Sequence, residues 1–176
     1  MTDTALRETE GMTVILYRGA GGAALLAGVL RIASAFIPYA PDQAALETVF
    51  GLVDLGLLFG TIGIYLADRD ALGLAGLAGF VVLLSGIASI VGPDSVFLGV
   101  NTYAVGVNVI AAGAVILAVQ WLRTGRLTTS ALTLISSVAI GGIGPVAGLG
   151  GASFVAAGVL FGIAYAAAGL HLLRRF

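Results

Sequence analysis

Four polar residues recur in pairs within the hydrophobic part of the chain. Glu47 and Asp54 are seven residues apart, and Asn101 and Asn108 repeat that spacing. Seven residues bring a helix back to nearly the same face, so each pair predicts a polar stripe along one helix. Polar side chains inside a membrane are typical of substrate and ion pathways. Glu47, Asp54, Asn101 and Asn108 therefore form the candidate polar path of this sequence.

An arginine and an aspartate are expected at the same depth in the membrane. Arg31 lies seven residues before Pro38, and Asp54 lies seven residues after Glu47, so each is about 10 Å below the same surface. An isolated ionised side chain in hydrocarbon costs on the order of 3 kcal/mol, which favours a pair. Arg31 and Asp54 are thus the candidate intramembrane ion pair, which would join two neighbouring helices. The alternative interpretation assigns Asp54 to the polar path.

Other chemistries lack the residues they need. The chain has no cysteine, its eight basic residues are all arginines, and His171 is its single histidine. Thiolate chemistry, lysine Schiff bases and histidine metal clusters are therefore excluded. No serine has a histidine or acidic partner placed to activate it. We expect no enzyme activity, no catalytic residue, no metal site and no cofactor, and the net charge of −1 predicts no nucleic-acid partner.

Composition places these residues in membrane helices. Of the 176 residues, 59% are hydrophobic and 10% are charged, and the mean hydropathy is +1.10. A soluble domain carries about 25% charged residues, so a soluble fold is excluded. A helix needs around 20 apolar residues to cross a bilayer core. The sequence predicts an all-α integral membrane protein with six transmembrane helices, at about 14–37, 45–67, 72–91, 99–122, 129–144 and 152–173.

The arginines predict the orientation in the lipid bilayer. Seven of the eight fall at one side, namely Arg7, Arg18, Arg69, Arg123, Arg126, Arg174 and Arg175. The opposite loops contain Asp42 and Asp94 but no arginine. Because cytoplasmic loops are rich in basic residues, we expect a plasma (cytoplasmic) membrane protein with both termini in the cytoplasm. Tyr17, Tyr65 and Trp121 would mark the inner interface, and Tyr39 and Tyr103 the outer one.

A two-helix hairpin recurs three times, at about 14–69, 72–123 and 127–175, after a short cytoplasmic N-terminal segment at 1–13. Pro38, Pro93 and Pro145 fall at corresponding places, with shifts of 55 and 52 residues. Because each repeat crosses twice, all three share one orientation. The sequence therefore predicts a six-helix membrane domain at 14–176 that consists of three tandem hairpins with pseudo-threefold symmetry.

The candidate polar path follows this repeat in two hairpins. Glu47 and Asp54 correspond to Asn101 and Asn108 with a shift of 54 residues, but Leu160 takes this place in the third hairpin. That difference argues against a symmetric pore. Glycines predict close helix packing at the pairs Gly56 and Gly60, Gly158 and Gly162, and in the series Gly73, Gly76 and Gly79.

In architecture, the chain is similar to the urea/amide channel family and the acetate/succinate permease family, which are rings of three helical hairpins. The Asn-Pro-Ala-Pro signature of the permeases and the aromatic constrictions of the urea channels are absent. The resemblance covers the whole chain at the level of the fold. Two functional hypotheses remain. Three parallel hairpins with paired polar stripes suggest a channel or facilitator for a small neutral or weakly acidic solute, acting as a homo-oligomer. Glycine-rich helices, a single candidate ion pair and the absence of a convergent polar cluster suggest a non-catalytic packing or scaffold subunit with a membrane-complex partner.

Overall fold

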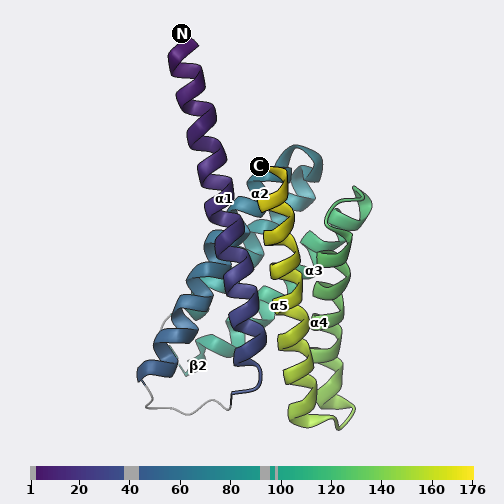
Figure 1. The fold of residues 1–176 in the computed structure, drawn as a ribbon. Helices are drawn as coiled ribbons and strands as arrows, with labels where there is room; N and C mark the ends of the chain where they lie inside the picture. The colour runs from purple at the N-terminus through teal and green to yellow at the C-terminus, as the bar shows by residue number, and fades with distance from the viewer. Residues whose placement is uncertain (1–2, 38–43, 92–95, 98) are drawn as a thin grey trace.

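The computed structural model describes residues 3–37, 44–91, 96–97 and 99–176, and these form an all-helical fold (Figure 1). Its helices are α1 (Asp3–Ser34), α2 (Ala44–Ile90), α3 (Thr102–Arg123), α4 (Thr128–Val146) and α5 (Gly150–Arg175). Within the described residues, these five helices are long and apolar enough to cross a membrane. The predicted all-α membrane class is therefore confirmed.

Helix α2 contains both the second and the third predicted membrane segments. Its 47 residues would span about 70 Å if straight, more than twice a bilayer core. Gly73 interrupts it with φ 60° and ψ −164°, a conformation that a side chain disfavours. A Cβ at Gly73 would meet no atom within 4 Å. The prediction that Gly73 serves close helix packing is therefore wrong, because this glycine forms the bend.

Helix α3 begins at Thr102, later than the predicted residue 99, because Asn101 caps it. The Asn101 Oδ1 accepts a hydrogen bond from the backbone N–H of Ala104 at 3.0 Å. Just before the cap, β1 (Val96–Phe97) and β2 (Val100–Asn101) pair antiparallel. An asparagine at this position satisfies one of the free N–H groups of the first turn.

The helices pack antiparallel through small residues. In the contact of α1 with α2, a Cβ at Gly56 would lie 2.9 Å from the Ala27 Cβ, and one at Gly60 would lie 2.7 Å from the Ala24 Cβ. Helix α1 also packs against α5, α3 packs against α2 and α4, and α4 packs against α5 (Figure 1). The hydrophobic core lies where these contacts meet.

The predicted proline register falls partly outside the structure. Pro145 lies in the last turn of α4. Pro38 and Pro93 lie outside the described residues, as do Tyr39, Asp42 and Asp94 of the predicted outer loops. The equivalence of the three prolines therefore stays a prediction.

Candidate functional site

The residues of the candidate polar path lie on α2 and α3 and do not share an enclosed site. Glu47, Asn101 and Asn108 are exposed, and Asp54 is half-buried. Both asparagines bond within their own helix, Asn101 as the cap and Asn108 through its Nδ2, which donates to the Ala104 carbonyl at 2.7 Å. Glu47 lies in the first turn of α2, where a negative charge interacts favourably with the helix dipole. Each residue thus has a local role, and a shared path stays a prediction.

Arg31 lies on α1 and Asp54 on α2, and these two helices pack against each other. Since Gly56 packs against Ala27, the antiparallel register brings Arg31 within about one turn of the level of Asp54. Their charges interact, and both side chains are half-buried. Among the described residues, however, no ion pair of 4.0 Å or less joins them. The direct ion pair therefore stays a prediction.

Arg31→Leu and Asp54→Leu should each lower the detergent melting temperature. The double variant should recover part of the loss, with a coupling on the order of 1 kcal/mol, because each single change leaves the other charge without its counterion. Thermal unfolding followed by circular dichroism measures this cycle. Additive losses in the double variant would show that the two residues act independently.

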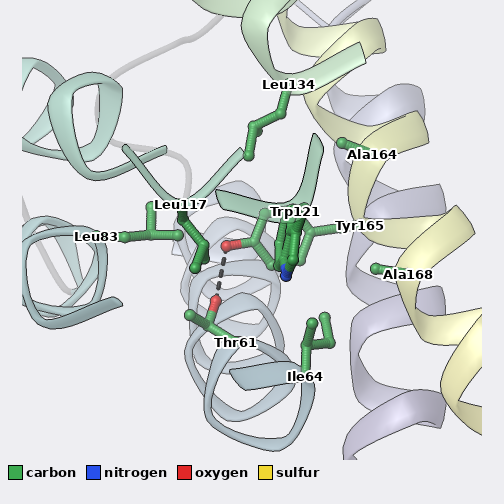
Figure 2. A pocket seen from close by; sticks show the side chains of 9 residues that line it. All are labelled: Thr61, Ile64, Leu83, Leu117, Trp121, Leu134, Ala164, Tyr165 and Ala168. Atoms are coloured by element: carbon green, nitrogen blue, oxygen red, sulfur yellow. Dashed lines mark hydrogen bonds between the residues drawn. The ribbon is translucent and has the colours of Figure 1, made fainter. Parts of the chain in front are cut away.

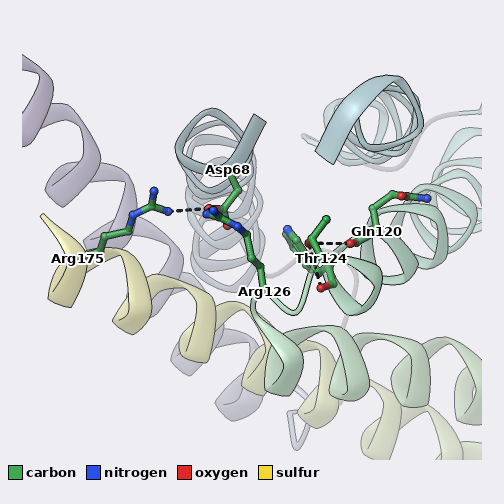
Figure 3. A network of polar contacts seen from close by, with 6 residues as sticks. Asp68, Gln120, Thr124, Arg126 and Arg175 are labelled. Atoms are coloured by element: carbon green, nitrogen blue, oxygen red, sulfur yellow. Dashed lines mark hydrogen bonds and ion pairs between the residues drawn. The ribbon is translucent and has the colours of Figure 1, made fainter. Parts of the chain in front are cut away.

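A buried carboxylate on α2 holds two arginines (Figure 3). The Asp68 Oδ1 accepts hydrogen bonds from the Arg126 Nη1 at 2.5 Å and from the Arg175 Nη1 at 2.6 Å. The Asp68 side chain is 3% exposed, whereas the arginine side chains are 42% and 36% exposed. This clamp of Asp68, Arg126 and Arg175 joins α2, the connection between α3 and α4, and the end of α5. Its net charge is positive, because one carboxylate meets two guanidinium groups.

The end of α3 positions Arg126 of the clamp. Gly125 has φ 66°, and its N–H donates to the Leu122 carbonyl at 3.2 Å. The Arg126 N–H donates to the Trp121 carbonyl at 2.8 Å. Together these bonds form a Schellman motif, in which glycine supplies the left-handed residue. The sequence Thr124-Gly125-Arg126 thus turns the chain so that the guanidinium group reaches Asp68 (Figure 3).

Sequence reasoning missed Asp68, although its position carries a signal. Buried residues of α2 recur at Leu57, Thr61, Ile64, Asp68 and Leu72, which is the spacing of one helix face. Asp68 is the charged residue of that stripe. A carboxylate on a core-facing stripe, at the end of the bundle that carries the arginines, indicates a buried ion pair.

A small cavity lies between α2, α3, α4 and α5 (Figure 2). Its volume is about 10 Å³, and aliphatic side chains such as Leu83, Leu117 and Leu134 form much of its wall. Thr61 and Tyr165 also line it, and their hydroxyl oxygens are 2.7 Å apart. None of the four residues of the candidate polar path lines this cavity.

Two predicted interface aromatics face the core instead. Trp121 is 4% exposed and Tyr65 is 8% exposed, so neither side chain is available to a lipid headgroup. Tyr65 stacks on Phe80 within α2, with ring centroids 4.1 Å apart. Their assignment to an aromatic belt is therefore wrong, because the helix periodicity turns both rings inward.

No protein family, no curated protein and no solved structure matches this chain. Within the described residues, no group of three or more acidic, histidine or cysteine side chains is arranged to hold a metal ion.

Proposed function

We propose that this chain is a non-catalytic packing or scaffold subunit of a membrane complex. The observation that carries the proposal is that buried apolar side chains fill the centre of the helix bundle. Leu83, Leu117 and Leu134 are each 1% exposed and meet there. A solute path needs polar groups and space along the bundle axis, and a cavity of about 10 Å³ whose wall is largely apolar offers little of either.

In this proposal the protein crosses the membrane six times as three hairpins. The bend at Gly73 supports two crossings by α2, since residues on either side of it pack against different helices. Gly60, before the bend, contacts α1 at Ala24, whereas Gly86, after the bend, contacts α3 at Ile110. With α4 and α5 as the third antiparallel pair, this packing supports the predicted tandem hairpins and their pseudo-threefold relation.

We place both termini in the cytoplasm. The first part of α1, the bend of α2, the junction of α3 with α4 and the C-terminus share one end of the bundle (Figure 1). Six exposed arginines belong to these segments: Arg18, Arg69, Arg123, Arg126, Arg174 and Arg175. Such an end is favoured on the cytoplasmic side of the plasma membrane.

Reconstitution into liposomes tests the scaffold proposal. Stopped-flow light scattering with urea, glycerol and acetic acid should give the same permeability for protein-containing and empty vesicles. Asp54→Asn, which removes the charge but keeps the shape of the side chain, should leave that permeability unchanged, because in this proposal the protein conducts no solute. A wild-type flux severalfold above empty vesicles would overturn the proposal.

The second candidate is a small-solute facilitator whose path runs between copies of the chain. The exposure of Asn108, which lies inside α3 rather than at its end, favours it, because polar side chains at membrane depth are costly against lipid. A homo-oligomer could turn such side chains toward a shared aqueous path. In the liposome experiment this candidate requires solute flux that Asn108→Leu reduces.

A further inference from the structure

A buried hydrogen-bond donor on α3 has no partner in the fold. Trp121 is 4% exposed, and its indole Nε1 has no hydrogen-bond partner among the described residues. An indole N–H can donate but cannot accept, so a donor group elsewhere in the protein would not satisfy it. The large majority of buried polar groups have a partner in the protein or in ordered water. The Trp121 side chain lines the cavity at the bundle centre (Figure 2).

Another residue that lines this cavity can supply an acceptor. The Thr61 hydroxyl donates its single proton to the Leu57 carbonyl at 2.7 Å. The hydrogen bond of 2.7 Å between Thr61 and Tyr165 must therefore be donated by the Tyr165 hydroxyl. That donation leaves lone pairs on the Tyr165 oxygen, so Tyr165 can accept a further hydrogen bond.

We propose that the cavity binds one water molecule, which accepts from the Trp121 indole N–H and donates to the Tyr165 hydroxyl oxygen. The volume of about 10 Å³ corresponds to roughly one water-sized probe. Larger ligands are excluded because the surrounding leucines are buried and close-packed. The water extends the chain of hydrogen bonds from Leu57 through Thr61 and Tyr165 to Trp121, so it links α2, α5 and α3. This site does not depend on whether the protein conducts a solute.

The chain contains a single tryptophan, which makes the site directly observable. Protein labelled with ¹⁵N-tryptophan in lipid nanodiscs gives one indole resonance by NMR. The indole proton should show a water cross-peak whose opposite signs in laboratory-frame and rotating-frame experiments mark direct contact rather than proton exchange. Tyr165→Phe keeps the ring but removes the acceptor, so the cross-peak should be lost. Gly22→Ala adds a methyl group where no atom lies within 4 Å and away from the residues that line the cavity, so it should retain the cross-peak.

Two results would overturn the proposal. One is a wild-type indole proton without a direct water contact, which shows a dry cavity and is decisive even where Tyr165→Phe fails to fold. The other is a folded Tyr165→Phe protein that keeps the wild-type cross-peak, since the water would then not depend on Tyr165. Circular dichroism establishes that each variant is folded.

Discussion

The double variant Arg126→Gln, Arg175→Gln should be less stable than the wild type by roughly 3–5 kcal/mol, because it leaves a buried carboxylate without a counterion. Both guanidinium groups bond to the same oxygen of Asp68, whose side chain is 3% exposed. Glutamine retains polar hydrogens but no charge. Unfolding in mixed detergent micelles, followed by circular dichroism, measures the loss.

Removing the carboxylate itself should be less damaging. In Asp68→Asn the unpaired charges belong to Arg126 and Arg175, whose side chains are 42% and 36% exposed and can be hydrated. We expect a loss of stability of about 1.5–3 kcal/mol, the range for a hydrogen bond to a charged group. The triple variant that combines Asp68→Asn with Arg126→Gln and Arg175→Gln should be more stable than the double arginine variant, because no buried charge remains.

A surface ion pair next to the clamp provides the matched control. Arg69 and Asp70 lie 3.4 Å apart with side chains 61% and 96% exposed. Arg69→Gln should change the stability by about 1 kcal/mol or less, as is typical of exposed pairs. Equal losses for Arg69→Gln and for the double arginine variant would show that the clamp does not stabilise the fold.

Hydropathy was sufficient to predict the class of fold, because a segment of about 20 apolar residues has few alternatives to a membrane helix. The exact positions at which helices begin, end or bend depend on local interactions that hydropathy does not describe. Asn101 ends the loop before α3 through its cap, and Gly73 bends α2 through a positive φ. Asparagine is typical of helix caps and glycine of bends. The chain contains many glycines, however, and the surrounding structure determines which of them bends a helix.

The candidate polar residues were harder to predict, since residue type alone does not give the direction of a side chain. Asn108 looked like part of a path, yet its amide bonds to the Ala104 carbonyl on its own helix. Asp68 lies on a buried stripe, yet its partners come from distant segments, near Arg126 and Arg175. The stripe marks Asp68 as buried, but its partners depend on how α2, the connection between α3 and α4, and the end of α5 pack together, which residue spacing does not reveal.

The contact of α1 with α5 provides a second test of what packs this bundle. Gly28 and Gly162 face each other, and a Cβ on either would lie 2.5 Å from the carbonyl oxygen of the other. Backbone atoms of two packed helices cannot move aside like the end of a flexible side chain. Gly28→Ala should therefore push α1 from α5 and destabilise the protein by roughly 1–3 kcal/mol, the range for overpacked cores.

Gly22 lies on the same helix and has open space around it, because a Cβ there would meet no atom within 4 Å. Gly22→Ala should be neutral or should stabilise by about 0.5–1 kcal/mol, since alanine favours helix over the unfolded chain. Comparing Gly28→Ala with Gly22→Ala thus separates two effects. Helix propensity favours both substitutions, whereas the contact between α1 and α5 opposes only Gly28→Ala. The expected result is a lower detergent melting temperature for Gly28→Ala and an unchanged or higher one for Gly22→Ala. If both variants gained stability equally, close approach at Gly28 would not be what holds α1 against α5.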